Sequence, residues 1–183
     1  MKSKENAVTG LTGGIEFLFK KNKVDYVKGY GKFQDKNTLE VDLIGGGTET
    51  IKAKNFIIAT GSEPNALPAS TGLATDEKFV VSSTGALSLD KIPKKMAVVG
   101  GGVIGIEMGS VYQRLGTEVT VIQHTDRICP FLDIEVGKSF TNVLKKQGLK
   151  FQFNSKVKNG VNNKEKGVIV NCEDAQDGTL SSL

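Results

Sequence analysis

The chain has 183 residues, 38% of them apolar and 24% charged, which is typical of a globular protein of one or two small domains. The net charge of +4 comes from lysines that are scattered or in short runs. Nucleic-acid binding requires a basic stripe with aromatic residues, so we expect no nucleic-acid partner. No apolar run reaches the roughly 18 residues of a membrane span, and no signal or other targeting segment is visible, so no membrane partner is expected either.

The first third of the chain predicts a short helix followed by an antiparallel meander. Leu11–Asn22 places apolar residues on one helical face, although Gly13 and Gly14 weaken that prediction. Three runs of strand-favouring residues follow, separated by Asp, Asn and Gly turns. A fourth run is shorter and almost wholly apolar, which is typical of a strand in the middle of a sheet. The predicted strands are Val24–Tyr30, Thr38–Leu43, Thr48–Ala53 and Asn55–Thr60.

The most informative feature is a strand–turn–helix–strand pattern with glycines in G-x-G-x-x-G spacing. Gly100 turns the chain sharply off the strand 97–99. Gly102 lets the backbone approach a pyrophosphate, and Gly105 lets the helix lie close to the sheet. The helix N-terminus then offers free N–H groups to the phosphates, and the second strand follows at Glu118–Ile122. The pattern predicts a dinucleotide-binding site.

Apolar spacing predicts which face of this helix packs on the sheet. The stripe consists of Ile104, Met108, Val111 and Leu115. Gly109 is expected to keep that contact close, and Gly116 to end the helix.

The last third predicts a second amphipathic helix and two more strands. The helix is expected over Asp133–Gln147, with Asp133 as its N-cap and Gly148 just beyond its end. Its predicted packed face consists of Val136, Phe140, Val143 and Leu144. Strands are expected at Lys150–Phe153 and Val168–Asn171, with a polar loop between them. The tail from Glu173 is expected to be loop-like.

Few side chains suggest metal or nucleophilic chemistry. Cys129 and Cys172 are 43 residues apart in sequence and match no metal or redox spacing, so unpaired thiols and no metal site are expected. His124, the single histidine, is interpreted as an exposed loop residue.

Several stretches of the chain together resemble dihydrolipoyl dehydrogenases, which are flavin-dependent pyridine nucleotide–disulfide oxidoreductases. The stretches are LTGGIEFLFKKNKV, VKGYGKF, IIATGSEP, VVSSTGALSL, VVGGGVIGIEMGSVYQRLG and VLKKQGLKFQFNSKV. The resemblance implies an α/β fold and a piece from the middle of the enzyme. Residues 1–65 would be the last part of an FAD domain with its β-meander, and 66–94 a crossover. Residues 95–183 would be a Rossmann-type NAD domain without its last strand.

The resemblance also implies two cofactors, FAD and NAD, and assigns residues to each. Those matching FAD contacts are Gly31, Thr60, Gly61 and Ser62. Without the resemblance, residues 60–62 would be interpreted as a plain strand-ending turn. Those matching NAD contacts are Gly100, Gly101, Gly102, Val103, Ile104, Gly105, Ile106, Glu107, Gln123 and Val157.

Gln123 departs from the family's pattern, which places Glu at the end of the second NAD strand. An amide oxygen still accepts a hydrogen bond from a ribose hydroxyl, but without the added strength that a charge gives. The neutral residue also removes a repulsion against a 2′-phosphate, and His124 and Arg127 follow closely. We expect NAD in preference to NADP.

The catalytic groups of the family are absent from this sequence, so no catalytic residue is assigned. The reaction needs a cysteine pair, a histidine–glutamate base and a first glycine loop for FAD, and none of these is present. The implied parent is a homodimer that oxidises protein-bound dihydrolipoamide. Its partner would be the lipoyl-bearing acyltransferase of a 2-oxo acid dehydrogenase complex, or the glycine cleavage system.

The resemblance implies the mitochondrial matrix, the cytoplasm for a bacterial parent, or a plastid. Two alternatives stay open. One is a shortened, non-catalytic nucleotide-binding protein. The other is an NADP-using relative of the glutathione or mercuric reductase type.

Overall fold

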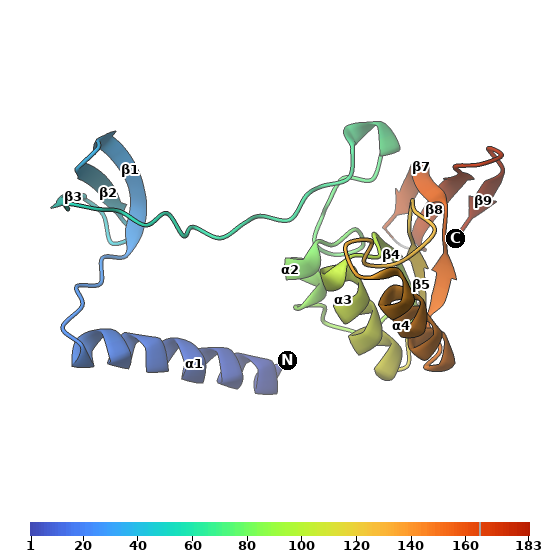
Figure 1. Cartoon of the computed structure of the whole chain (residues 1–183), viewed down its shortest axis with the longest axis horizontal. Coiled ribbons are helices and arrows are strands. Elements are labelled where there is room, and N and C mark those ends of the chain that lie inside the picture. Colours follow the sequence, from blue (N-terminus) through green and yellow to red (C-terminus); the bar gives the residue numbers. More distant parts are fainter. Residues whose placement is uncertain (165) are drawn as a thin grey trace. The chain divides into compact units, whose positions relative to one another are not determined.

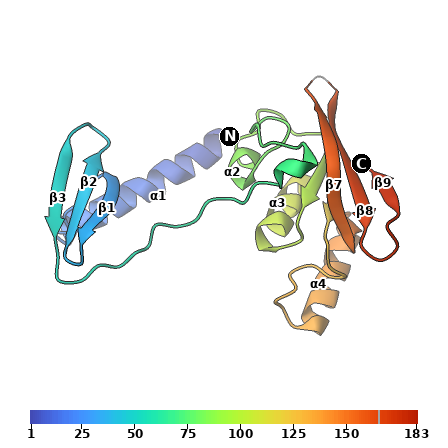
Figure 2. The same cartoon turned by 90° about the horizontal axis from the view of Figure 1, so that it is seen from above.

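The structure is a computed structural model that describes residues 1–164 and 166–183. It divides into two compact units, Met1–Ser62 and Glu63–Leu183, which we call the N-terminal unit and the C-terminal unit. Each is described separately, and Figures 1 and 2 show their elements. Among the described residues, no helix combines the length and apolar character needed to cross a bilayer.

The N-terminal unit consists of one helix and one small antiparallel sheet. Helix α1 spans Lys2–Lys21, and the sheet has the order β1 (Gly29–Asp35), β2 (Thr38–Leu43) and β3 (Thr48–Lys52). Residues 1–62 include a single buried residue, Val41, and α1 has none. The unit is therefore held mainly by its backbone ladder and leaves most of its apolar side chains in water.

Three sequence predictions for this unit are wrong. Helix α1 begins at Lys2 rather than at Leu11. The first strand occupies Gly29–Asp35 rather than Val24–Tyr30, because that stretch pairs with β2 from Gly29↔Leu43 to Asp35↔Thr38. The apolar run 55–60 forms no strand; Ile57 is 93% exposed and Ile58 74%. A wholly apolar strand needs neighbours on both edges and cover on both faces, and the described residues provide neither.

The C-terminal unit is built around a parallel three-stranded sheet in the order β4 (Lys95–Val99), β5 (Glu118–Ile122) and β6 (Lys150–Gln152). Helices α3 (Val103–Arg114) and α4 (Ile134–Lys146) connect these strands. In Figure 1 they lie on the side of the unit away from β9. The unit also has a short 3-10 turn, η1 (Ala69–Thr71), and one helical turn, α2 (Ser83–Ala86).

A second sheet, antiparallel, follows β6. It has the order β7 (Ser155–Asn163), β8 (Gly167–Asp174) and β9 (Leu180–Ser182). Its strands lie side by side in Figure 2. The sequence prediction of a polar loop before residue 168 and a loop-like tail is wrong here. Antiparallel pairing satisfies the backbone groups whatever the side chains are, so a polar stretch such as 155–163 forms a strand once β8 lies beside it.

Strand β5 separates two hydrophobic clusters. Val119 and Val121, both fully buried, face the cluster formed with Ile106, Tyr112 and Leu144 of the helices. Ile122 points to the opposite face, as the strand alternation requires, and joins a second cluster. The buried members of that cluster are Leu73, Ile122, Val170 and Cys172. The end of β5, where Gln123 follows, is therefore fixed from both sides.

The predicted packing faces of the two helices are wrong in part. In α3, Ile104, Val111 and Leu115 are exposed, and the buried residues are instead Ile106, Gly109 and Tyr112. In α4 the buried residues are Gly137, Thr141 and Leu144, with Phe140 half-buried, while Val136 and Val143 are exposed. In α3, Gly109 faces the sheet, and its missing side chain lets the helix come close to Val119 and Val98. In α4, the small residues Gly137 and Thr141 share the buried face with Leu144. Counting large apolar residues alone therefore places the face incorrectly.

Candidate functional site

The glycine loop joins β4 to α3 in the predicted geometry. Gly100 has φ +105°, a value that L side chains rarely adopt, and its N–H donates to the Ile122 carbonyl at 2.9 Å. A Cβ on Gly105 would overlap the Gly100 carbonyl oxygen and lie 3.2 Å from Val98. Two of the predicted roles, the sharp turn and the close helix–strand contact, are therefore confirmed.

Gly102 lies at the N-cap of α3 and faces open space. A Cβ there would meet nothing within 4 Å, and the N-cap makes no side-chain hydrogen bond. The first turn of α3 carries no acidic residue. The first N–H groups of a helix have no partner within it, and its N-terminus carries a partial positive charge. The loop is therefore open, uncapped and electrostatically suited to a diphosphate.

The other residues assigned to the NAD site around the glycine loop are partly exposed and partly buried. Val103, Ile104 and Glu107 are exposed at the start of α3, so their side chains or backbone are accessible to a ligand. Ile106 is buried in the helix–sheet core, so its side chain faces away from solvent. Gly101 is also buried, and a Cβ there would lie 3.2 Å from Ile128.

Gln123, at the carboxyl end of β5, connects the glycine loop to the loop that follows. Its Oε1 accepts from the Gly101 N–H at 2.8 Å, and its Nε2 donates to Thr125 Oγ1 at 2.6 Å. Thr125 Oγ1 in turn donates to the Arg127 carbonyl at 2.9 Å. The side chain is 4% exposed. The structure thus places Gln123 beside the loop, as the sequence predicts, with its amide already engaged at both ends.

Sequence reasoning missed the contribution of residues 125–129. Cys129 has φ +43°, and its N–H donates to the Gly101 carbonyl at 2.8 Å, so this segment holds the glycine loop from the other side. Thr125 could have been considered, since its hydroxyl lies only two residues beyond Gln123 in the sequence. The unusual conformation at Cys129 leaves no such signal.

The sequence also singles out Val157, His124 and the two cysteines in this unit. Val157 is half-buried in β7 and packs against the cluster around Ile122. Two residues earlier, the Ser155 N–H donates to the Gln123 carbonyl at 3.0 Å, so this strand lies beside the end of β5. His124 is exposed, and both cysteines are free thiols, as predicted. Burial raises the pKa of both Cys129 and Cys172, which makes them less reactive.

The residues assigned to FAD do not form a pocket by themselves. Gly31 lies in β1 opposite Val41, whereas Thr60, Gly61 and Ser62 lie in an exposed segment without regular structure. Gly61 has φ +77°, so a turn at this point is built into the backbone. No step of a reaction follows from the arrangement of these four residues.

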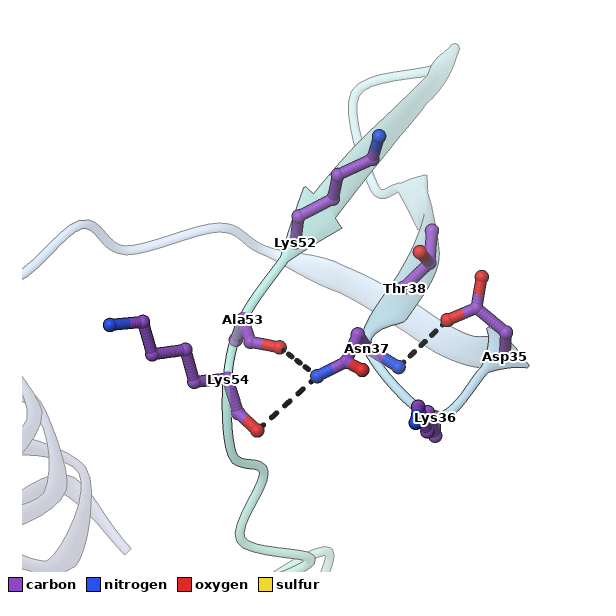
Figure 3. A pocket seen from close by; sticks show the side chains of 7 residues that line it. All are labelled: Asp35, Lys36, Asn37, Thr38, Lys52, Ala53 and Lys54. Atoms are coloured by element: carbon purple, nitrogen blue, oxygen red, sulfur yellow. Dashed lines mark hydrogen bonds between the residues drawn. The ribbon is translucent and has the colours of Figure 1, made fainter.

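Two hollows elsewhere involve none of the predicted site residues. One, of about 600 Å³, lies at the β1–β2 turn (Figure 3). Asn37 closes this turn: its Nδ2 donates to the Ala53 carbonyl at 2.8 Å, and its backbone N–H donates to Asp35 Oδ1 at 2.7 Å. The other, of about 290 Å³, is lined by Lys156, Glu173, Asp174, Ala175 and Gly178. Within residues 1–164 and 166–183, no three His, Cys, Asp or Glu side chains are grouped to hold a metal ion.

A strand, an open glycine turn, a helix and a second parallel strand define a Rossmann-type dinucleotide-binding unit. The model of the pyridine nucleotide-disulphide oxidoreductase family matches residues 2–180, and the chain belongs to this family of oxidoreductases. It is 52% identical to the dihydrolipoamide dehydrogenase of Chaetomium thermophilum, over the whole chain and 36% of that protein. It is 50% identical to mitochondrial dihydrolipoyl dehydrogenase 1 of Arabidopsis thaliana, over the whole chain and 35% of that protein.

The fold has a counterpart among solved structures. The crystal structure of LpdA from Mycobacterium tuberculosis matches 84% of this chain and 33% of LpdA, with a TM-score of 0.69 and 24% identity. The α/β, Rossmann-type fold class predicted from the sequence is confirmed. The chain spans about a third of the length of the curated relatives it matches.

Proposed function

We propose that this chain is the central part of a dihydrolipoyl dehydrogenase and that its C-terminal unit binds NAD. The observation that carries the proposal is the open, uncapped glycine loop at the N-terminus of α3. The identity of about 50% to dihydrolipoyl dehydrogenases over the whole chain supports it. The proposed domains have the bounds expected from the sequence. Residues 1–65 would belong to the FAD-binding domain, 66–94 would form the crossover, and 95–183 would form the NAD-binding domain.

Each residue of the loop has a distinct proposed role in holding the dinucleotide. Gly102 leaves room for the diphosphate, and the backbone N–H groups at the start of α3 donate to it. Gln123 and Cys129 fix the loop through Gly101, so little ordering of the loop remains to be done when the ligand binds. Glu107 would lie toward the nicotinamide end, and Val157 toward the adenine. NAD, when bound, supplies hydride acceptance at its nicotinamide ring.

The wider setting follows from the parent enzyme and is proposed with it. The parent would be a homodimer that uses FAD and oxidises dihydrolipoamide on an acyltransferase of a 2-oxo acid dehydrogenase complex, or in the glycine cleavage system. Mitochondrial residence is proposed on the same basis, since the Arabidopsis relative is named as mitochondrial. The chain alone supplies the nucleotide site and part of the flavin wall, and it is expected to be inactive in lipoamide oxidation.

Direct binding of NADH to the full chain tests the nucleotide site. Gly102→Ala should weaken NADH binding at least tenfold without loss of stability, because its Cβ meets nothing until the diphosphate is bound. Gly109→Ala, in the same helix, is the matched control: its Cβ would make an ordinary contact with Val119 of β5 at 3.4 Å, and binding should not change. Equal binding by the Gly102 variant would contradict the proposed diphosphate position.

The mass of the native protein tests the parent. An antibody raised to this chain should detect a species roughly three times its 19.6 kDa, since the chain covers about a third of its relatives. A native species of 19.6 kDa would instead support the shortened nucleotide-binding protein.

A further inference from the structure

The side chain of Gln123 is committed to the protein itself. Both ends of the amide are hydrogen-bonded, to the Gly101 N–H and to Thr125 Oγ1, and the backbone of the same residue pairs with Gln152 and Ser155. The amide accepts from Gly101 while donating to Thr125, which an ionised carboxylate cannot do. A carboxylate would require Thr125 to donate, which breaks the hydrogen bond from Thr125 to the Arg127 carbonyl. Gln123 is therefore part of how this loop is built.

The charge near Gln123 is balanced. Nucleotide sites that exclude a 2′-phosphate place a carboxylate at the end of the second strand. Here that position is neutral, and the next four residues contain one acid, Asp126, and one permanent cation, Arg127. Asp126 and His124 are both exposed. A 2′-phosphate carrying about −1.5 to −2 charge would thus meet no net negative charge from this segment.

Arg127 retains the capacity to bind such a phosphate. One N–H of its Nη2 donates to the Pro130 carbonyl at 3.1 Å, and a guanidinium has five N–H donors. The contact with Pro130 holds the side chain within the segment that packs on the glycine loop. A guanidinium group suits bidentate recognition of a phosphate.

We propose that Gln123 makes the nucleotide site indifferent to a 2′-phosphate, so that the chain binds NADPH about as tightly as NADH, with Arg127 beside the phosphate. The inference rests on the proposed nucleotide site and concerns its selectivity, where it replaces the sequence-based expectation that NAD is preferred to NADP.

Calorimetric titration of the full chain with NADH and with NADPH tests this selectivity. The two dissociation constants should lie within about threefold of each other. Gln123→Glu should shift their ratio at least tenfold in favour of NADH, and Arg127→Gln should shift it in the same direction by several-fold. Gln147→Glu is the matched control, because it adds the same charge at the exposed C-cap of α4, and it should leave the ratio unchanged.

The outcomes are separable. If the unmodified chain binds NADH at least tenfold more tightly than NADPH, the selectivity inference is overturned and the nucleotide site stands. An unchanged ratio in both Gln123→Glu and Arg127→Gln overturns it as well. If the folded chain, checked by circular dichroism, binds neither nucleotide, the proposed function itself fails and this inference with it.

Discussion

The two units of this chain differ in where their apolar side chains go. In the C-terminal unit, Val119, Val121 and Ile128 are fully buried, and two clusters enclose β5. In the N-terminal unit, Leu11 of α1 is 71% exposed and only Val41 is buried. Both units have regular elements with good local signals. The difference shows that a motif with its own packing partners nearby in sequence makes a core, whereas elements without such partners form only local structure.

Hydrogen exchange of the full chain should show the largest effect. Amides of β5 are expected to exchange at least a thousandfold more slowly than those of α1, a difference of about 4 kcal/mol in opening free energy. The reason is that β5 opens only when both clusters are lost, while α1 has no buried residue. Exchange measured by mass spectrometry or NMR would check this. Similar protection of the β5 and α1 amides would mean that the difference in burial does not set their opening free energies.

Gly105→Ala should give the next largest effect, confined to the C-terminal unit. The added methyl would meet the Gly100 carbonyl oxygen, a backbone atom that cannot move without opening the glycine loop. We expect a loss of about 3 kcal/mol in the free energy of unfolding, as for an overpacked core. Gly109→Ala, one turn later, should change it by less than about 1 kcal/mol, and in the stabilising direction, since alanine favours the helix. Urea denaturation of both variants measures the difference. Equal losses would mean that α3 does not lie against the Gly100 carbonyl and Val98 at Gly105.

The features that could be predicted from the sequence are those that depend on residues near one another in the chain. The glycine loop, the strand Glu118–Ile122 and the N-cap at Asp133 were predictable, because each depends on a few neighbouring residues with strict conformational needs. The packed faces of α3 and α4 were predicted only in part, because Gly109 in α3 and Gly137 and Thr141 in α4 are buried alongside the apolar residues. The strand at Ser155–Asn163 was also missed, since its order comes from pairing with β8 rather than from its own side chains.

In the site, the sequence identified Gln123 and its neighbourhood but not the way the amide is used. The expected ribose acceptor is engaged by Gly101 and Thr125. That arrangement depends on residues 125–129 folding back on the glycine loop, with a left-handed conformation at Cys129. Such a return of the chain leaves no periodic signal in the sequence.

The Asp76 carboxylate offers a pH-dependent test within the C-terminal unit. Its Oδ1 accepts from the backbone N–H groups of Lys78, Phe79 and Val80, and its Oδ2 accepts from Asn162 Nδ2 at 2.8 Å. Burial by itself raises the pKa of this carboxyl, but these hydrogen bonds outweigh it and hold the pKa well below its usual range. A lowered pKa in the folded state means that the contribution is complete above the unfolded pKa of about 3.9 and is lost as the pH falls below it.

We therefore expect Asp76→Ala to destabilise the C-terminal unit by about 2 kcal/mol at pH 7. The difference from the unmodified chain should shrink as the pH is lowered from about 4 toward 2. Urea denaturation at several pH values measures it, and Asp90→Ala, at an exposed aspartate of the same unit, is the control. If the difference in free energy of unfolding stays constant down to pH 2, the stabilisation does not depend on the negative charge of Asp76.

The smallest expected effect compares the starts of two helices. Asp133 caps α4 by accepting from the N–H groups of Glu135 at 2.8 Å and Val136 at 3.3 Å. The N-cap residue of α1, Met1, makes no side-chain hydrogen bond. Asp133→Ala should lower the free energy of unfolding of the C-terminal unit by about 1 kcal/mol, and Asp133→Asn, which caps about equally well, should change it little. Replacing Lys2 by Asp near the start of α1 should raise helicity in circular dichroism without changing that unfolding free energy, because α1 has no buried residue through which a gain could reach the rest of the chain. A matching gain in the C-terminal unit would show that the two units are energetically coupled.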